Sequence, residues 1–380
     1  PLNRASDKRP RMESVAAFTD TYLPTVNGVT YTVKSWRDRW QERGGRMAVV
    51  CPDAPDREPE ADEHPIRSLP LPIYAGYRVG LPQIPDAVAD VDIVHAHTPF
   101  SLGLAGMRLA RRHDLPLVAT YHTPTSEYAS YLSSWEPARE RAANLSRRYE
   151  SWFLNRADAV IVPSETTGEY VAEELGVDDP KVVPNGVDTE RFHPVDSTAF
   201  RERYDLPTDR TIVGYTGRHG HEKSLPEIVA ACDRLDREVT VVFGGDGPAR
   251  EELEEAARKR NLDARFLGFL DRDELPAFYA GLDAFLFPSP VETQGLVALE
   301  AFACGTPVVG VDSGALSDTV DDGETGYHFE PGDVDGFADA IERTVDERER
   351  LRENCLDRRE SISVDHAVDR LSEIYATVRE

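Results

Sequence analysis

Two glutamates stand eight positions apart in the stretch PVETQGLVALEAFACGTP, residues 290–307. Glu292 lies in a polar turn, whereas Glu300 interrupts an apolar run. A buried carboxylate is costly unless it is paired, so Glu300 needs a partner. Carboxylates also accept hydrogen bonds from neighbouring hydroxyl groups. The spacing therefore predicts a site for a hydroxyl-rich ligand, although a solvated Glu292 and an ion-paired Glu300 would also account for it.

Two cations occur in TGRHGHEKSLPEIVAA, residues 216–231, between an expected strand and an expected helix. Arg218 follows Gly217, a residue that lets a ligand approach the backbone closely, and Lys223 comes five positions later. Such a turn at a helix N-terminus is typical of a phosphate or diphosphate site. Solvated surface cations are the alternative, which the scarcity of lysine in this chain disfavours.

Three histidines follow or end expected strands of the first half. His95 and His97 are two positions apart on VDIVHAH and should share one face, and His122 ends LPLVATYH. His122 is a candidate to contact a reacting sugar or phosphate, although a lone histidine is more often structural. No third metal ligand is evident beside His95 and His97, so we expect no metal.

Short apolar strands alternate with helical patterns throughout, which predicts an α/β fold with parallel sheets. We expect two α/β units, residues 12–186 and 187–364, with Asn185 at the hinge and a final helix over 365–380. Residues 53–85, rich in proline and acid, are expected to form long loops. Ligands bind beyond the carboxyl ends of parallel strands, so His97, His122 and Ser164 should line one crevice.

The composition indicates the cellular environment of the protein. The 380 residues carry a formal net charge of −26, and only five of the 43 basic residues are lysines. Such a surface suits a protein that stays hydrated in concentrated salt, so we expect a high-salt cytoplasm, and the acidic field argues against nucleic-acid binding. The four cysteines show no close pairing, which indicates a reducing compartment. No secretory signal or membrane span is evident, and Met12 is a candidate start of the natural chain.

An ordered set of motifs resembles the family 4 retaining glycosyltransferases of the GT-B fold. The set runs along nearly the whole chain and includes TDTYLPTVNGV, VHAHTPF, TYHTPTSEY, VPNGVDTERFHP, GRHGHEK, GGDGP and PVETQGLVALEAFACGTPVVG. The last segment is the most specific, because Glu292 and Glu300 match the E-x7-E motif of that family. The resemblance implies two Rossmann-like domains with a cleft between them and a C-terminal helix that crosses back to the first domain.

The resemblance also implies roles for single residues. Arg218 and Lys223 would neutralise the donor diphosphate, which Gly28 and Gly217 approach. Glu292 would bind the donor sugar and Glu300 the ribose. His122 would contact the sugar near the reacting centre. Further expected contacts are the amides near Gly295 and Leu296, the base beside Phe269, and the acceptor side of the cleft at His97, Tyr121 and Asn185. No metal or other cofactor is required.

One departure bears on the acceptor. Many family members have E-x-F-G where this chain has Glu292-Thr293-Gln294-Gly295. This motif and TYHTPTSEY look more like the branch that glucosylates diacylglycerol, which favours UDP-glucose as donor and a membrane lipid as acceptor. Arginines and aromatics alternate in residues 133–156, and with RLARRH at 108–113 they could form a peripheral membrane face. An amphipathic helix with Trp135, Trp152 and Phe153 in the core is the alternative.

The sequence is also compatible with other functions. The same fold could serve a soluble sugar, a sugar phosphate or a glycan as acceptor. A nucleotide-sugar epimerase is a further alternative, which the E-x7-E match disfavours. A binding module without catalysis would be expected to lack Arg218, Lys223 or Glu292, and all three are present.

Overall fold

The computed structural model describes residues 12–55, 57–70, 78–122 and 136–379, with the side chains of 136–140 left aside. These residues form two compact units. Unit 1 consists of Pro1–Pro163, Gly168–Val183 and Ala367–Glu380, and unit 2 of Ser164–Thr167 and Pro184–His366. The sequence boundaries expected at 186 and 364 lie within three residues of these divisions.

Unit 1 is built on a seven-stranded sheet in the order β3-β2-β1-β6-β7-β8-β9, in which all pairs are parallel. Its strands are β1 (Ser14–Phe18), β2 (Arg46–Pro52), β3 (Glu63–Ile66), β6 (Ile93–Ala96), β7 (Leu117–Thr120), β8 (Ala159–Val162) and β9 (Lys181–Val182). The middle strands are buried on both faces, which explains their nearly continuous apolar sequences. The α/β architecture predicted from the alternating pattern is confirmed.

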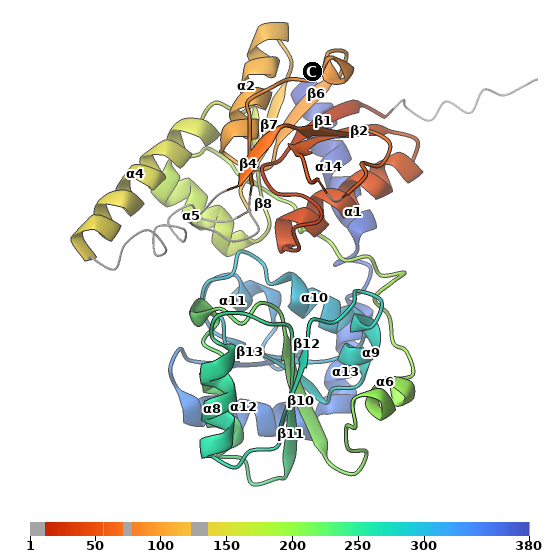
Figure 1. Cartoon of the computed structure of the whole chain (residues 1–380), viewed down its shortest axis with the longest axis vertical. Helices are drawn as coiled ribbons and strands as arrows, with labels where there is room; N and C mark the ends of the chain where they lie inside the picture. Colours follow the sequence, from red (N-terminus) through yellow and green to blue (C-terminus); the bar gives the residue numbers. More distant parts are fainter. Residues whose placement is uncertain (1–11, 56, 71–77, 123–135, 380) are drawn as a thin grey trace, which may run out of the picture. The chain divides into compact units, whose positions relative to one another are not determined.

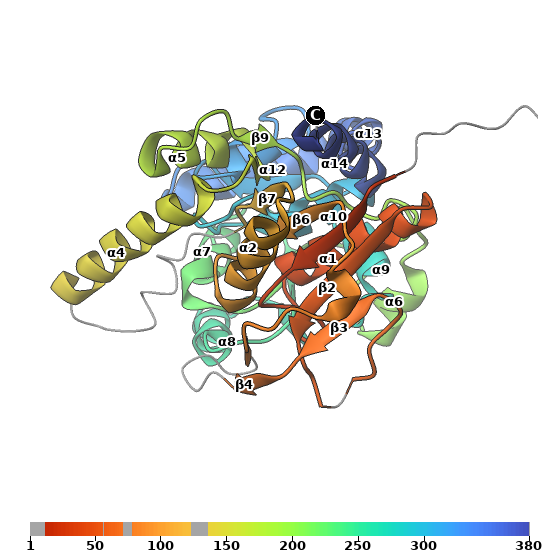
Figure 2. The same ribbon diagram turned by 90° about the horizontal axis from the view of Figure 1, so that it is seen from above.

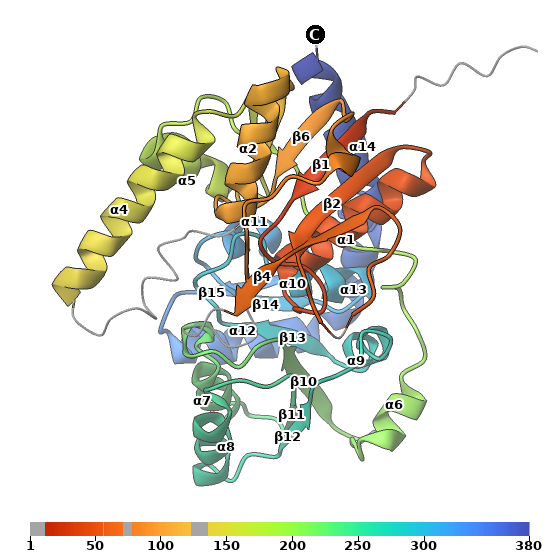
Figure 3. The same cartoon turned by 45° about the horizontal axis from the view of Figure 1, so that its top comes forward.

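Helices cover both faces of this sheet. They are α1 (Gly28–Glu42), α2 (Ser101–His113), α4 (Glu136–Leu154), α5 (Glu165–Leu175) and α14 (Val364–Arg379), with a 3-10 turn η1 (Asp86–Val88). His95 faces α1 and α14, whereas its neighbour Val94 faces Gly106 of α2, because successive strand residues point to opposite faces. The outer half of α4 projects away from the sheet (Figures 2 and 3).

The prediction of long loops over residues 53–85 is wrong for part of the segment. Strand β3 joins the main sheet beside β2, and β4 (Ser68–Pro70) pairs antiparallel with β5 (Arg78–Gly80). Strand β3 contains Pro65, which lacks an amide hydrogen and is tolerated because β3 lies at the sheet edge. Proline there masked the strand signal.

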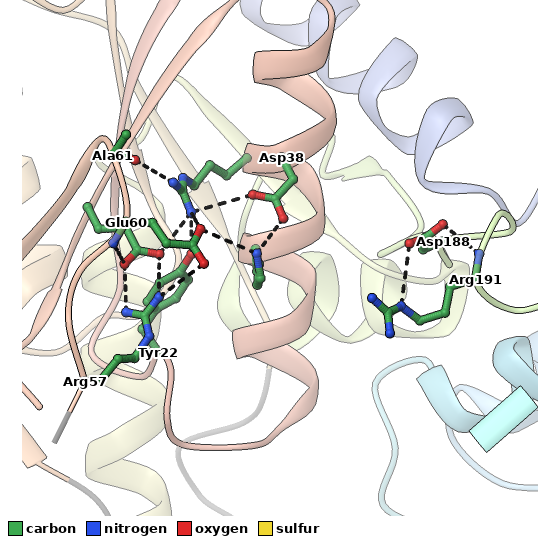
Figure 4. A network of polar contacts seen from close by, with 10 residues as sticks. Tyr22, Asp38, Arg57, Glu60, Ala61, Asp188 and Arg191 are labelled. Carbon is green, nitrogen blue, oxygen red and sulfur yellow. Dashed lines mark hydrogen bonds and ion pairs between the residues drawn. The ribbon is translucent and has the colours of Figure 1, made fainter. Parts of the chain in front are cut away.

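A buried ion cluster fixes this edge of the sheet to α1. Glu63 is buried and accepts hydrogen bonds from Arg37 (2.9 Å) and Arg57 (2.9 Å). Arg37 also donates to Glu60 at 3.0 Å and lies 3.4 Å from the hydroxyl of Tyr22 (Figure 4). Because Tyr22 lies in the loop after β1, the cluster holds that loop in place.

Unit 2 contains a parallel six-stranded sheet in the order β12-β11-β10-β13-β14-β15. The strands are β10 (Thr211–Thr216), β11 (Val239–Gly244), β12 (Ala264–Gly268), β13 (Ala284–Phe287), β14 (Val308–Val311) and β15 (Gly326–Phe329). The helices are α6 (Thr198–Arg203), η2 (His221–Lys223), α7 (Pro226–Cys232), α8 (Arg250–Lys259), α9 (Leu275–Ala280), α10 (Leu296–Ala303), α11 (Leu316–Thr319), α12 (Val334–Asp346) and α13 (Arg348–Asp357). Helices α7, α8 and α12 lie on one face of the sheet and α9, α10 and α13 on the other (Figure 1).

Candidate active site

The strand order marks one position in each sheet as a natural ligand site. In unit 1 the order reverses between β1 and β6, and in unit 2 between β10 and β13. Ligands of open α/β sheets bind at such switch points, beyond the carboxyl ends of the strands. The predicted cations follow β10 and Glu292 follows β13, so both loops meet at the switch point of unit 2.

Lys223 and Glu292 are joined at this switch point. The Nζ atom of Lys223 donates to Oε1 of Glu292 at 2.5 Å, and both side chains are largely buried. Burial is the largest influence and alone would lower the pKa of Lys223, but the charge of Glu292, the neighbouring Tyr215 and the hydrogen bond to Glu292 together outweigh it and raise that pKa above its ordinary value. The site therefore keeps a full positive charge beside a carboxylate.

Arg218 lies in the same loop and is ion-paired with Glu222. Its side chain is 43% exposed, so it can exchange this partner for a ligand anion. Gly217, just before it, has a φ of +145°, and a Cβ there would come within 2.7 Å of the Tyr215 hydroxyl. The φ and the Tyr215 side chain require glycine in this turn, and the predicted approach of a diphosphate to its backbone stays a prediction.

Glu300 lies one turn into α10 and is buried. The hydroxyl of Tyr279 donates to its Oε2 atom at 2.9 Å, and Arg272 lies 3.5 Å from its Oε1 atom. Burial raises the pKa of Glu300, while the charge of Arg272 and the Tyr279 hydroxyl limit the rise. The predicted need for a partner is confirmed, but no local pattern pointed to these two residues.

The helix start beside Glu292 is built on a glycine. Gly295 is the N-cap of α10 in the left-handed region (φ +76°), and a Cβ there would meet Leu316 and Phe287 at 2.9 Å. Leu296 is the first helical residue, as predicted. Phe269 follows β12 and is 68% exposed, so its ring is accessible.

The two residues between Glu292 and Gly295 are tied into the loop. Gln294 is buried, and its Oε1 atom accepts from the backbone amide of Asn185 at 2.8 Å. The carbonyl of Thr293 accepts from the hydroxyl of Ser164 at 2.9 Å. Ser164, which was expected beside the histidines, thus belongs to unit 2. The unusual Thr-Gln pair has a structural role here that the sequence motif did not indicate.

In unit 1 the histidines form a buried stack at the switch point. The His97 Nδ1 atom lies 3.1 Å from the Nε2 atom of His122, and the rings of His95 and His97 stack 4.0 Å apart. His95 also bonds Tyr375 of α14 (2.7 Å) and Thr120 (2.6 Å). Burial lowers the pKa of His95 and of His122 to about 3, and burial together with the two neighbouring histidines lowers the pKa of His97 well below its ordinary value. These rings are therefore neutral at physiological pH.

Other predicted residues of unit 1 lie near this stack or open to solvent. Tyr121 is buried with its ring 6.2 Å from that of Tyr170. Gly28 opens α1, and a Cβ there would meet nothing within 4 Å, so its surroundings leave room for a ligand. Residues 123–128 of TYHTPTSEY lie outside the described part of the chain.

Neither a metal cluster nor a membrane span is found in the described residues. No group of three or more histidines, cysteines, aspartates or glutamates there could hold a metal ion. No helix there is long and apolar enough to cross a membrane.

Comparison with known proteins decides the family. The chain matches Glycosyltransferase Family 4 over residues 26–191 and Glycosyl transferases group 1 over residues 196–359. A GDP-mannose-dependent alpha-mannosyltransferase of Mycolicibacterium smegmatis is 32% identical to it, over 87% of this chain and 87% of that protein. The chain belongs to the family 4 glycosyltransferases. It is a glycosyltransferase, as the motifs predicted.

Other members of the family are similar over different shares of their length. An alpha-monoglucosyldiacylglycerol synthase of Streptococcus pneumoniae is 27% identical over 95% of this chain and 85% of that protein. The sulfoquinovosyl transferase SQD2 of Arabidopsis thaliana is 33% identical over 74% of this chain, but the match spans only 56% of that protein.

Solved structures show the fold. The sucrose-phosphate synthase of Thermosynechococcus elongatus aligns with a TM-score of 0.78 at 23% identity, over 96% of this chain and 99% of that chain. HepE of Anabaena, in complex with UDP and glucose, aligns with a TM-score of 0.74 at 19% identity, over 96% of this chain and 100% of that chain. Together with the two parallel sheets, these likenesses confirm the GT-B fold.

Proposed function

We propose that this glycosyltransferase moves a hexose, favouring glucose on UDP, to the hydroxyl of a membrane glycerolipid, with retention at the anomeric carbon. The observation that carries the chemistry is the pair formed by Lys223 and Glu292 at the switch point of unit 2. A cation and a carboxylate in contact offer one group for a diphosphate and one for sugar hydroxyls. Glu300, buried on α10 just after the loop that carries Glu292, would bind the ribose.

The proposed reaction needs no protein nucleophile. The bond between C1 of the sugar and the diphosphate oxygen breaks while the acceptor oxygen attacks C1 from the same face. The departing diphosphate takes the acceptor proton, and Arg218 and Lys223 stabilise the charge that develops on it. Since these two cations can neutralise the diphosphate, we expect no metal requirement. The contacts predicted for Gly28, Phe269 and His122 with the donor remain part of this proposal.

The acceptor is inferred from the name of a relative and from the surface of α2 and α4. The name of the pneumococcal relative indicates a glucosylated diacylglycerol, and that relative aligns over 95% of this chain. The mannosyltransferase relatives instead name GDP-mannose, which is the main rival donor. A soluble sugar, sugar phosphate or glycan remains the rival acceptor.

The surface of α2 and α4 favours a lipid acceptor. Helix α2 contains three arginines and no acidic residue, and the only acidic residue of α4 among its described side chains, Glu150, is buried. Trp152 is 40% exposed with the Arg156 guanidinium 4.4 Å from its ring. It borders a hollow of about 660 Å³ lined by Leu104, Met107, Arg108, Arg111, Arg112 and Trp152. We call these lining residues and Arg156 the arginine face.

An arginine face on so acidic a protein complements an anionic bilayer. Arginine near a negatively charged membrane surface contributes about 1 kcal/mol per residue, and an exposed tryptophan suits the interface. Phe153, in contrast, is buried, so the aromatic residues of α4 divide between core and surface. Trp135, the third predicted aromatic, lies outside the described residues. We propose peripheral membrane contact through residues 133–156 together with α2.

A donor and acceptor panel tests the function. UDP-glucose, other UDP-sugars and GDP-mannose are each incubated with diacylglycerol in mixed micelles or with soluble sugars. We expect nucleotide release and a glycolipid mass only with UDP-glucose and the lipid. Transfer from GDP-mannose would correct the donor, transfer to soluble sugars alone would correct the acceptor, and no transfer from any donor would refute the function.

Vesicle sedimentation tests the membrane contact separately. The Arg111→Gln/Arg112→Gln and Arg108→Gln/Arg156→Gln variants, all within the arginine face, are compared with Arg258→Gln, an exposed arginine of α8. We expect wild type and the α8 control to bind vesicles of phosphatidylcholine mixed with phosphatidylglycerol, and both double variants to bind less. Equal binding by all proteins, or equal binding to phosphatidylcholine alone, would contradict the arginine face.

A further inference from the structure

Two loops at the carboxyl edge of the unit 2 sheet are interlocked. The amide of Gly217 donates to the carbonyl of Gly244 (3.2 Å), and the amide of His219 donates to the carbonyl of Asp246 (2.9 Å). The carbonyl of His219 in turn accepts from the amide of Ala249 at 2.9 Å. The loop after β10, which carries Arg218, is thus bonded along its length to the loop after β11.

Glycine makes this contact possible. A Cβ on Gly245 would lie 2.0 Å from the carbonyl oxygen of Gly217, and a Cβ on Gly247 would lie 2.5 Å from that of His219. Both would collide with backbone, which cannot move aside as a flexible side chain can. The sequence motifs left the segment GGDGP without a defined role. In the structure it packs against the predicted diphosphate loop and supports its backbone.

The side chain of His219 completes the lock. It is fully buried, and its Nε2 atom lies 3.1 Å from the carbonyl oxygen of Gly244, the same oxygen that Gly217 contacts. Because a carbonyl can only accept, Nε2 carries the proton and donates. Burial lowers the pKa of His219, which keeps the ring neutral with Nδ1 unprotonated.

The other ring nitrogen shows that this histidine is not a simple core residue. The Nδ1 atom is buried with no hydrogen-bond partner among the described residues. The ring contacts the aromatic rings of Tyr215 and Phe243, at centroid distances of 6.3 Å and 6.2 Å. An unpaired buried acceptor costs stability, so a phenylalanine would satisfy packing alone at lower cost. The hydrogen bond to Gly244 is what a histidine adds.

We propose that His219 is a positioning residue, whose hydrogen bond to Gly244 holds Gly217 and Arg218 where the donor diphosphate must be neutralised. The proposal rests on the function proposed for Arg218. It does not make His219 a catalytic residue, since its ring is buried against the loop. The role is to fix the backbone on which the arginine is carried, because small displacements of charged groups cost much of their transition-state stabilisation.

A double-mutant cycle tests the coupling. His219→Phe keeps a ring and removes the donor, and we expect kcat to fall about 10-fold or more with a smaller change in UDP affinity. In an Arg218→Ala background the same substitution should have almost no further effect, because His219 acts through Arg218. His219→Gln, which keeps an N–H donor, should recover most of the loss. His221→Phe, an exposed neighbour in the same loop, is the matched control and should resemble wild type.

The outcomes separate this inference from the proposed function. Wild-type kcat in His219→Phe, or an equal loss with and without Arg218, would overturn the positioning role. If the phenylalanine variant does not fold, His219→Leu is carried through the same cycle. A wild-type protein that binds UDP or GDP but transfers no sugar would refute the proposed function, and the cycle is then measured on nucleotide affinity. Equal nucleotide affinity of wild type and His219→Phe would in that case overturn the inference.

Discussion

The switch point of one sheet holds charged side chains, whereas that of the other holds neutral ones. In unit 2 a lysine and a glutamate face each other as a charged pair, and the neighbouring arginine is also ion-paired. In unit 1 the rings of three histidines pack against Trp36, and burial holds them neutral. The strand order reverses in the same way in both sheets. The burial and the partners of each side chain therefore decide whether it is charged.

The difference indicates a division of labour. A charged pair can bind a diphosphate and stabilise a leaving group, because each charge is sustained by its neighbour. A neutral histidine can donate or accept hydrogen bonds but offers no charge to a ligand. Under the proposed function, unit 2 would take the diphosphate of the donor, and the stack in unit 1 would suit an uncharged group such as a sugar hydroxyl.

The largest expected effect comes from breaking the charged pair. Lys223→Ala and Glu292→Ala should each lower kcat/KM for the donor about 10²–10³-fold, since each removes a group aimed at the reacting end of the donor. Nucleotide release at saturating acceptor measures the loss, and circular dichroism checks the fold. Lys259→Ala, at an exposed lysine of α8, is the control and should keep full activity. Turnover near wild type in either pair variant would remove that residue from the site.

A smaller effect is expected from the carboxylate deeper in unit 2. Glu300→Gln keeps the shape but removes the charge opposite Arg272, and should raise the donor KM about 10-fold with a lesser change in kcat. Tyr279→Phe, which removes one hydrogen bond to Glu300, should show a weaker version of the same pattern. Steady-state kinetics with varied donor separates the two parameters. A fall in kcat at unchanged KM would place Glu300 in the chemical step instead.

The neutrality of the unit 1 stack is testable by pH. Folding depresses the pKa of His95 and His122 from about 6.5 to about 3, so the unfolded chain binds more protons below pH 6.5. The contribution of these neutral histidines to the free energy of unfolding is therefore complete above pH 6.5. It is lost as pH falls toward 3, by up to about 1.4 kcal/mol per pH unit for each histidine. Chemical denaturation between pH 7.5 and 4.5 measures this slope.

A matched pair of variants identifies the source of that slope. His122→Asn should reduce the slope, whereas His113→Gln, at the exposed end of α2, should leave it unchanged. An identical slope in all three proteins would mean that the stack already titrates near its ordinary pKa, and the contrast between the two switch points would then fail.

The smallest effect concerns backbone strain beside Lys223. Ser224 caps η2 in the left-handed region, with a φ of +52°, which costs most residues about 1–2 kcal/mol. Ser224→Gly should raise the free energy of unfolding by about 0.5–1 kcal/mol and leave transfer unchanged. Ser224→Ala retains the Cβ and should give no such gain. A marked loss of activity in the glycine variant would show that the strain helps to hold Lys223.

Local sequence predicts local features of the candidate site, and the limits of that prediction have physical causes. The start of α10 at Leu296 depends on neighbouring residues and was predicted, as was the need of Glu300 for a partner. The partners of Glu300 could not be predicted, since Tyr279 in α9 and Arg272 in the turn before α9 lie more than 20 residues upstream and meet it only through packing. The split between exposed Trp152 and buried Phe153 depends on which side of α4 meets the sheet.

The path of the last helix has a practical consequence for dissecting the enzyme. Helix α14 begins in unit 2 and continues in unit 1, where Tyr375 is buried against Trp40 and His95. A gene fragment that ends at residue 183 would thus lack a piece of its own core, and one that starts at 184 would end in an orphaned amphipathic tail. Separate expression of the first lobe calls for residues 367–380 to be joined to it by a linker, or supplied in trans as a peptide.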